Sequence, residues 1–538
     1  MASSVSSSDS SDKGSKPHID PILQNALRYT VSAREYRLLH EYLLSRTSAT
    51  RKRTPQPRRY EAIVEHQSGS DFNVTTVRLA LRIFTAAYVG FQGWDYVMRR
   101  ITAWRQGSRS RQNTNRGTRA ASCRISASLA LILVFHRLLH RFLLRLRTSL
   151  LEASASPFRR RNPRIAQILT SLHYPAIGAA LSGLSLGICP KSQLRISVAI
   201  YTFSRALEFA YNAAEEMGVW GARGKPSWLG SWLIMPFACA QLLHAFVFDR
   251  DCFPANYGSS ILKRSPEYVQ HRPSTYPKDK FWPSELQVVD GLAILSKSRW
   301  PAFVSPILFP GARQSLPAIS NLAPIYSPAH PSTQHTSCAL LHPHDPSCTR
   351  TYLKYFLAAF PSNARTFTVL YATFALFSWK SMLADPKSFL NSLALRILRM
   401  TLFLTGAIGT SWGSICLFAN YLPRNFLATQ RWLLSGFLGG LFAFVARRGE
   451  RSTFLYSARL SIDSLWKVGI KRGWWRGMKG GDVILFTTSL ALINVLYTSR
   501  PDAVKGALIR RGLDVLRAPQ PDGCPKSNTT DSQGDIDG

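Results

Sequence analysis

Apolar residues in this chain gather into long runs, which strongly basic connectors separate. The run at 174–189, YPAIGAALSGLSLGIC, is rich in glycine, and a turn, a segment of helical periodicity and a second apolar run at 228–248 follow it. The same order recurs in the second half, with WLLSGFLGGLFAFVA at 432–446 and an apolar run at 483–497. A unit of this length that occurs twice predicts a duplicated multi-helix module.

The lengths of these runs favour a membrane protein. Several approach the roughly 17–25 residues that a helical span needs, which suggests about six to ten spans. The mean hydropathy of −0.05 averages the apolar runs with the basic connectors. We therefore expect an all-α fold, a multi-pass transmembrane helix bundle built from two tandem repeat modules.

The high positive charge of the chain raises the alternative of a nucleic-acid-binding protein. The 538 residues carry a formal net charge of +37, which is also typical of nucleic-acid-binding proteins. The sequence has no zinc-finger spacing, basic zipper or RNA-binding signature, and its arginines flank apolar runs, where they can contact lipid phosphates. We expect membrane lipids as partners and no nucleic acid; other organellar membrane proteins and a second copy of the chain are further candidates.

Composition divides the chain into six parts. They are a disordered N-terminus (1–18), an amphipathic helical region with its linker (19–60), a first membrane module (75–248), a loop rich in proline and aromatic residues (249–334), a second membrane module (335–515) and a disordered tail (516–538). The loop is too polar and too often broken by proline to span a membrane, although a short helix at 285–297 is expected within it. A loop of this length is usually functional or disordered.

Small residues in the apolar runs predict close helix packing. Little hydrophobic force holds helices together in lipid, so backbone approach over small residues supplies much of their association. The candidates form three GxxxG steps: Gly183 and Gly187, Gly409 and Gly413, Gly436 and Gly440. The first and third steps lie at corresponding positions of the two expected modules.

Opposite charges also recur in the modules. Arg205 and Glu208 are three residues apart, and Arg459 and Asp463 are four apart, so each pair can meet on one helix face. If these helices span the membrane, the pairs are buried and functional. If the helices lie at the interface, the charges face water, and the neighbouring polar residues favour this second interpretation.

The second module opens with a cysteine–histidine motif, HTSCALLHPHDPSC, at 335–348. Thiolate and imidazole are the usual ligands of zinc, and Cys338, His342, His344 and Cys348 would supply them, although their spacing matches no standard finger. A disulfide is an alternative. A thiol nucleophile with an adjacent histidine base is another.

The favoured interpretation of this motif is a structural helix start. Asp345, Pro346 and Ser347 have the composition of a cap for a helix that begins near Cys348. We therefore expect no catalytic residue, no cofactor and no metal in this chain.

The second half resembles the transmembrane protein 135 family. The resemblance rests on the cysteine–histidine motif, LYATFALFSW at 370–379, ARRGERSTFLYSARLSIDSLWKVGIKRG at 446–473 and GDVILFTTSLALINVLY at 481–497. It covers about residues 335–515 and, more loosely, 174–264. The glycine steps are also similar, more distantly, to a class of small glycine-rich membrane proteins.

Members of this family are multi-pass proteins of peroxisomal and mitochondrial membranes, implicated in lipid and sterol handling and in organelle organisation. The resemblance therefore implies a non-enzymatic membrane protein of one of these organelles, rather than of the plasma membrane, that supports lipid or sterol transport or the organisation of the organelle. One alternative is a translocase-like or structural scaffold. Another is a lipid-modifying enzyme that uses Cys338, His342 and Cys348. Transport predicts a cavity lined by the four repeat charges, a scaffold predicts a packed bundle, and an enzyme predicts that His342 and Cys348 face a cleft together.

Overall fold

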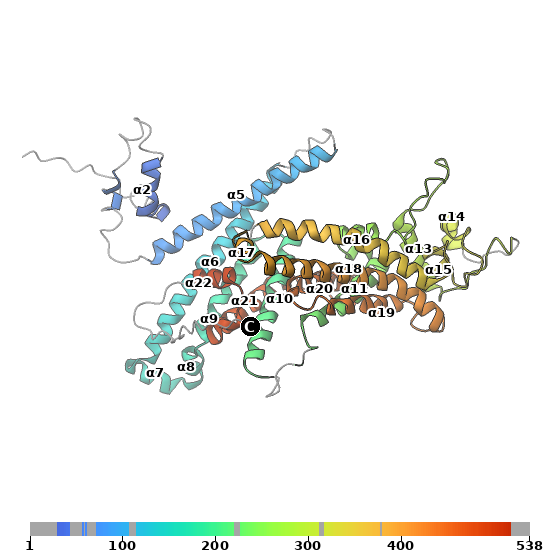
Figure 1. Ribbon diagram of the computed structural model, residues 1–538. Helices are drawn as coiled ribbons and strands as arrows, with labels where there is room; N and C mark the ends of the chain where they lie inside the picture. Colours follow the sequence, from blue (N-terminus) through green and yellow to red (C-terminus); the bar gives the residue numbers. More distant parts are fainter. Residues whose placement is uncertain are drawn as a thin grey trace, which may run out of the picture. The chain divides into compact units, whose positions relative to one another are not determined.

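The computed structural model describes residues 29–42, 56–58, 60–61, 72–106, 115–219, 226, 228–310, 317–376 and 379–517. The regular secondary structure of these residues is entirely helical, apart from one isolated β-bridge between Ala302 and His335 (Figure 1). The expected all-α fold is confirmed. The segments predicted to be disordered, 1–18 and all but the first two residues of 516–538, lie outside the described residues, as does most of the region 19–60.

The chain divides into two compact units, and the first combines residues 1–213 with 480–538. Its helices are α2 (Ala33–Tyr42), α5 (Phe72–Gln106), α6 (Asn115–Leu151), η2 (Ala153–Ala155), α7 (Ser156–Arg161), α8 (Pro163–Thr170), α9 (Tyr174–Ala180), η3 (Leu181–Ile188), most of α10 (Gln193–Glu216), α21 (Gly481–Ser499), η8 (Pro501–Ala503) and α22 (Ala507–Leu516).

The second unit is the stretch 214–479. Its helices are η4 (Ser231–Leu233), α11 (Ile234–Phe248), η5 (Arg250–Cys252), α12 (Ala255–Lys263), α13 (Glu285–Lys297), η6 (Pro317–Leu322), α14 (Ala323–Tyr326), α15 (Thr336–Leu341), α16 (Cys348–Leu376), α17 (Trp379–Ala384), α18 (Pro386–Tyr421), α19 (Arg431–Gly440), η7 (Leu441–Phe444) and α20 (Arg451–Lys471).

Five helices in the described residues are long and apolar enough to cross a membrane, which is compatible with a multi-pass membrane protein. They are Phe72–Ile101, Arg119–Leu151, Ser231–Phe248, Pro386–Tyr421 and Gly481–Ser499. The two glycine-rich runs form shorter helices, Tyr174–Ile188 and Arg431–Phe444, which change from α to 3₁₀ geometry part-way. Because these fall below the roughly 17 residues of a span, the count is lower than the six to ten expected.

In the first unit, α21 packs against α9 and η3, and α6 packs against α5, α9 and η3. An ion pair joins Arg195 of α10 to Asp482 in the first turn of α21, with both side chains largely buried. Asn212, further along α10, donates to the backbone carbonyl of Ala503 at 2.8 Å. These contacts attach the C-terminal helices to helices from the first half of the chain.

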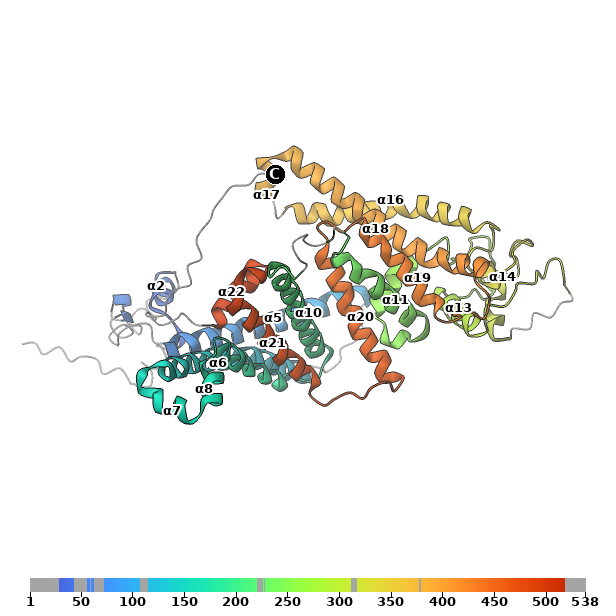
Figure 2. The same cartoon turned by 90° about the horizontal axis from the view of Figure 1, so that it is seen from below.

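In the second unit, α11 packs against α19 and α20, and α16 lies along α18, as Figures 1 and 2 both show. A Cβ at Gly436 would be 2.4 Å from the carbonyl oxygen of Cys239, and one at Gly440 would be 2.4 Å from the Cα of Pro236. The neighbours are backbone atoms of α11. Glycine therefore allows α19 to touch α11 backbone to backbone.

The N-terminus of α19 is attached to the C-terminus of α18 by a buried arginine. Arg431 is 1% exposed, and its guanidinium donates to the carbonyl oxygens of Leu422, Pro423 and Phe426. Carbonyl groups at a helix C-terminus lack partners within the helix, and a cation is favoured there. The buried charge is thus satisfied by main-chain oxygens.

The segment 249–334, expected as a long loop, is largely folded where it is described. Its helix α13 (Glu285–Lys297) has the bounds predicted from the sequence, and Ser284 and Gln287 form a capping box at its start. Val288, Leu292 and Leu295 of α13 are fully buried in the main core of the second unit. Their helical spacing provides the apolar face of the helix that the sequence predicted there.

We expect Gly440→Ala to destabilise the second unit. The added methyl group would collide with the backbone of α11, which cannot move as a side-chain end can, and overpacking of this kind costs about 1–3 kcal/mol. The midpoint of thermal unfolding in detergent measures the loss. Gly187→Ala is the control, because no described atom lies within 4 Å of the Cβ position at Gly187; an equal loss in both variants would contradict the packing argument.

Candidate functional site

Four side chains of the second unit converge on one point. The sulfur atoms of Cys338, Cys348 and Cys416 and a ring nitrogen of His342 lie within 4.8 Å of one another. The Sγ atoms of Cys338 and Cys348 are 3.8 Å apart, and the Sγ of Cys416 is 3.4 Å from Nε2 of His342. We call these four residues the thiol–imidazole cluster.

Three of the four come from the predicted motif. Cys338 lies on α15, His342 follows the last residue of α15, and Cys348 is the first residue of α16. The backbone amide of His342 donates to the carbonyl of Cys338 at 2.8 Å, which closes a turn and directs the imidazole toward the thiols. His344, the other histidine of the motif, is exposed and is not a member.

The fourth member, Cys416, lies near the C-terminal end of α18. In the sequence it sits within an apolar run, where a free thiol is usually a small hydrophobic residue. Nothing in its local pattern connects it with residues so far upstream. Only the packing of α18 against α15 and α16 brings it to the cluster.

A hydrogen bond fixes the orientation of the imidazole. Nδ1 of His342 lies 2.7 Å from the carbonyl oxygen of Asp345, so the proton is assigned to Nδ1, which donates. This assignment leaves Nε2 facing the sulfur atoms; Nε2 carries a lone pair in the neutral ring and a second proton in the charged ring. The Asp345 carboxylate accepts hydrogen bonds from Lys354 at 2.8 Å and from the amide of Ser347 at 3.1 Å, and the bond from Lys354 holds the pKa of Asp345 below its usual value.

The charges of the cluster are coupled. Burial lowers the pKa of His342, but hydrogen bonds to Cys338 and Cys348 more than offset this and raise it to about 10. Hydrogen bonds from the other thiols, together with the imidazole, lower the pKa of Cys348 well below that of a free cysteine. A thiolate is therefore favoured here, as in metal sites and reactive cysteines.

Access to the cluster is restricted. Cys338 and His342 are each 3% exposed and Cys416 is 1% exposed, and Cys348 is half-buried. Neither of the two pockets described below includes any of them. A substrate could not reach these thiols through either pocket. A small ion needs no such path if the protein folds around it.

Helix α16 begins at Cys348, where the sequence predicted a helix start. Ser347 supplies the cap, since its Oγ accepts a hydrogen bond from the backbone amide of Arg350 at 3.3 Å. Pro346 separates Ser347 from Asp345. The motif therefore both starts helix α16 and supplies three members of the thiol–imidazole cluster.

The repeat charges are engaged in local pairs. Arg205 donates to Glu208 at 2.7 Å in the first unit. In the second unit Asp463 pairs with Lys467 of the same helix at 2.6 Å, and Arg459 lies half-buried one turn before it. Neither pair lines either of the two pockets described below.

A buried charge that the sequence did not single out is Glu450. It is 3% exposed, and it accepts hydrogen bonds from Arg396 at 2.6 Å and from the hydroxyl of Tyr371 at 3.1 Å. In the sequence it is the lone acidic residue of the basic turn RRGER. This isolation indicates a charge pair, because a single carboxylate among arginines is expected to form an ion pair with an arginine.

The predicted packing glycines differ in their surroundings. A Cβ at Gly183 would be 2.8 Å from the Thr487 hydroxyl, and one at Gly409 would be 2.7 Å from the ring of Tyr355. A Cβ at Gly413 would be 3.1 Å from the ring of Tyr352, and Gly187 has open space among the described residues. Close backbone approach is thus seen at Gly436 and Gly440, and at Gly183, where the Cα of Thr487 would be 3.0 Å away.

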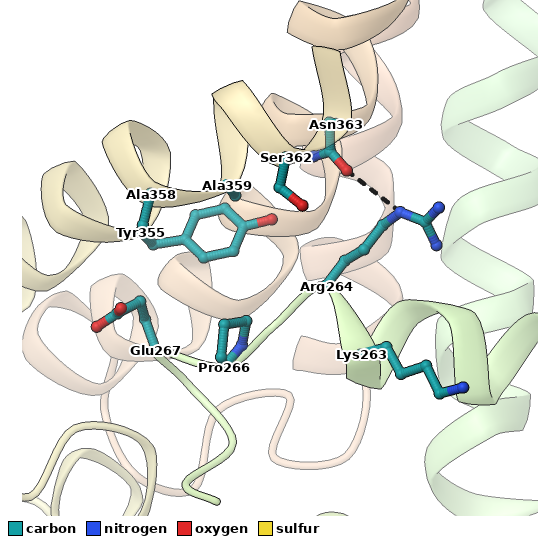
Figure 3. Close-up of a pocket in the computed structure, with 9 residues that line it drawn as sticks. All are labelled: Lys263, Arg264, Pro266, Glu267, Tyr355, Ala358, Ala359, Ser362 and Asn363. Carbon is teal, nitrogen blue, oxygen red and sulfur yellow. Dashed lines mark hydrogen bonds between the residues drawn. The ribbon is translucent and has the colours of Figure 1, made fainter. Parts of the chain in front are cut away.

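Figure 3 shows a pocket of about 80 Å³ in the second unit, between the end of α12 and the side of α16. Arg264 donates to the Asn363 side chain at 3.2 Å across it. Binding sites for organic ligands usually have about 300–1,000 Å³. This pocket has room for a few water molecules but not for a lipid.

A larger, open pocket of about 660 Å³ belongs to the first unit, where α2 meets α5 and α6. Its charged lining consists of four arginines and one glutamate: Arg34, Arg78, Arg82, Arg137 and Glu35. Arg82 pairs with Glu35 at 2.6 Å, and Nε of Arg137 is buried without a hydrogen-bond partner among the described residues. The surplus of positive charge suits an anion.

Comparisons with known proteins give no family for this chain. No protein-family model matches it, and no solved structure matches its fold.

We expect Ser347→Ala to lower stability by about 1 kcal/mol, the usual cost of losing a helix cap. Ser347→Asp should retain most of that stability, because a carboxylate oxygen can also accept the amide of Arg350. Thermal unfolding of both variants in detergent measures the difference. Equal losses would show that the Ser347 hydroxyl does not act as a cap.

Proposed function

We propose that this chain is a non-enzymatic, multi-pass membrane protein that acts as a close-packed scaffold. The observation that carries the proposal is the backbone contact of Gly436 and Gly440 with α11. A path for solutes needs space between helices, whereas these two helices touch along their main chains. Contacts of this kind favour fixed rather than sliding helices.

The distribution of charge and space agrees with a scaffold. Glu450 is paired with Arg396, and Asp463 is paired with Lys467. The pocket beside Tyr355 is too small for a lipid. A transport path lined by the repeat charges finds no support in either described pocket.

The two tandem modules are part of this proposal. In both halves a glycine-rich helix that ends in 3₁₀ geometry precedes a long helix and then an apolar helix: α9, η3, α10 and α11, against α19, η7, α20 and α21. Gly218 and Gly473, at matching positions after the long helix, both have positive φ, 69° and 71°. An L-residue with a side chain rarely adopts this conformation, so the correspondence supports a duplication.

The cellular setting comes from the resemblance to the transmembrane protein 135 family. It points to a peroxisomal or mitochondrial membrane and to a role in lipid handling or organelle organisation. A scaffold serves such a role by holding partners or by organising lipid around it. The five apolar helices are consistent with integral insertion.

The scaffold proposal predicts that purified protein in liposomes moves no lipid. Labelled-lipid transfer should proceed at the rate of protein-free liposomes, for the wild type and for Arg459→Ala and Asp463→Ala alike. If the wild type moves lipid and either variant fails while its helical content and unfolding midpoint are unchanged, the scaffold proposal is wrong. The repeat charges would then line a transport path.

A second candidate function, binding of anionic phospholipid, is favoured by the basic pocket of the first unit. Arginine recognises phosphate through paired hydrogen bonds. The pocket volume of about 660 Å³ suits a lipid headgroup. Such binding is compatible with a scaffold, because it fixes lipid rather than moving it.

Native mass spectrometry tests this binding. We expect the wild type to retain an anionic phospholipid in detergent, and Arg78→Glu combined with Arg82→Glu to weaken retention at least about tenfold, at about 1 kcal/mol per basic residue. Arg365→Glu combined with Arg350→Glu is the control, since both are exposed arginines of α16. Equal retention by both double variants would rule out the pocket as the site.

A further inference from the structure

We propose that Cys338, His342, Cys348 and Cys416 bind one Zn²⁺ ion in a closed site with three sulfur ligands and one nitrogen ligand. The inference is independent of the proposed function, because a structural ion would serve a scaffold, a transporter or an enzyme equally. It rests on the geometry of the cluster, the orientation of the imidazole and the burial of the ligands.

The spacing of the ligand atoms fits a tetrahedral ion. Zinc binds cysteine sulfur at about 2.3 Å and histidine nitrogen at about 2.0–2.1 Å. In a regular tetrahedron, these bond lengths separate two sulfur atoms by about 3.8 Å, and a sulfur and a nitrogen by about 3.5 Å. The observed separations are 3.8 Å for Cys338 and Cys348 and 3.4 Å for Cys416 and His342.

The histidine ring has the orientation that a metal ligand requires. Nδ1 donates its proton to the carbonyl of Asp345, so Nε2 lies on the side of the thiols. Metal binding displaces protons from its ligands, and the lone pair of Nε2 then faces the ion. Ligating histidines in metal sites usually donate their other ring nitrogen to a carbonyl or carboxylate in this way. The Asp345 carbonyl is therefore the outer partner that keeps the ring in position.

The donor set selects zinc among common ions. Three thiolates and an imidazole are soft ligands, which calcium and magnesium avoid. All four ligand atoms lie within 4.8 Å of one another, so they enclose room for one ion and not for an iron–sulfur cluster with its bridging sulfides. A mononuclear tetrahedral site with sulfur and nitrogen ligands is typical of zinc.

The site has a structural rather than a catalytic form. A catalytic zinc site keeps one position for water or substrate, whereas here the protein supplies all four ligands. The ligands come from α15, the turn after it, the start of α16 and the end of α18. The ion would therefore fasten the folded segment before α16 to an apolar helix that is long enough to span the membrane.

Metal analysis of the purified full-length chain tests the proposal. After dialysis without a strong chelator, we expect about one zinc per chain, and zinc-edge X-ray absorption should find three sulfur neighbours at about 2.3 Å and one nitrogen at about 2.0–2.1 Å. This measurement needs no variant. Absence of zinc, or zinc with oxygen neighbours only, overturns the proposal.

Matched variants locate the ion. Cys416→Ser and His342→Ala should each lower the zinc content at least about tenfold, because a ligand is lost. Cys252→Ser, at a buried cysteine elsewhere in the same unit, and His344→Ala, at the exposed histidine of the motif, should retain it. Zinc retained in both ligand variants overturns the assignment, as does a disulfide between Cys338 and Cys348 detected by mass spectrometry of the wild type.

Discussion

The second unit depends on the backbone contact between α11 and α19. Two glycines of α19 have no room for a side chain, because carbonyl and Cα atoms of α11 occupy that space. This contact fixes the distance and direction of two helices, and the neighbouring elements follow. Helix α20 packs on α11, α18 packs on α19, and α16 packs on α18. In a membrane, where exclusion of water contributes little between helices, such dispersion contacts supply the missing force.

In both units, several buried charges meet a fixed partner. Arg195 meets Asp482, and Arg396 meets Glu450. Arg431 meets three carbonyl groups instead of an acid, one at the C-cap of α18 and two in the turn that follows it. Charges that satisfy one another in this way are weak evidence for stability, but they restrict the alignment of helices. The packing of the glycine-rich helices and the pairing of charges therefore act on the same geometry.

Helices and their start positions could be predicted from the sequence, whereas contacts between residues far apart in the chain could not. The all-α fold, helix 285–297 and the helix start at Cys348 depend on periodicity and capping residues, which are read within a few positions. The roles of Cys416 and Glu450 depend on which helices become neighbours; no residue near Cys416 indicates this, and the arginines around Glu450 indicate a partner without identifying Arg396. The burial of helix 285–297 could not be read from the sequence for a related reason, since Val288, Leu292 and Leu295 are covered by elements from elsewhere in the unit. The motif itself supplied three of the four members of the cluster, and the distant helix supplied the fourth.

The division of the chain has a consequence for its biosynthesis. The first unit is discontinuous, because α21 follows the entire second unit in the sequence. A ribosome that has finished α10 has therefore made Arg195 without Asp482, and the small-residue face at Gly183 without the helix that covers it. The early helices must wait for their partners until some 270 further residues have emerged, about 14–54 s at a typical synthesis rate. The N-terminal unit is thus the first to be translated and the last to be completed, and a nascent chain that stops before α21 exposes its unfinished surface to quality control.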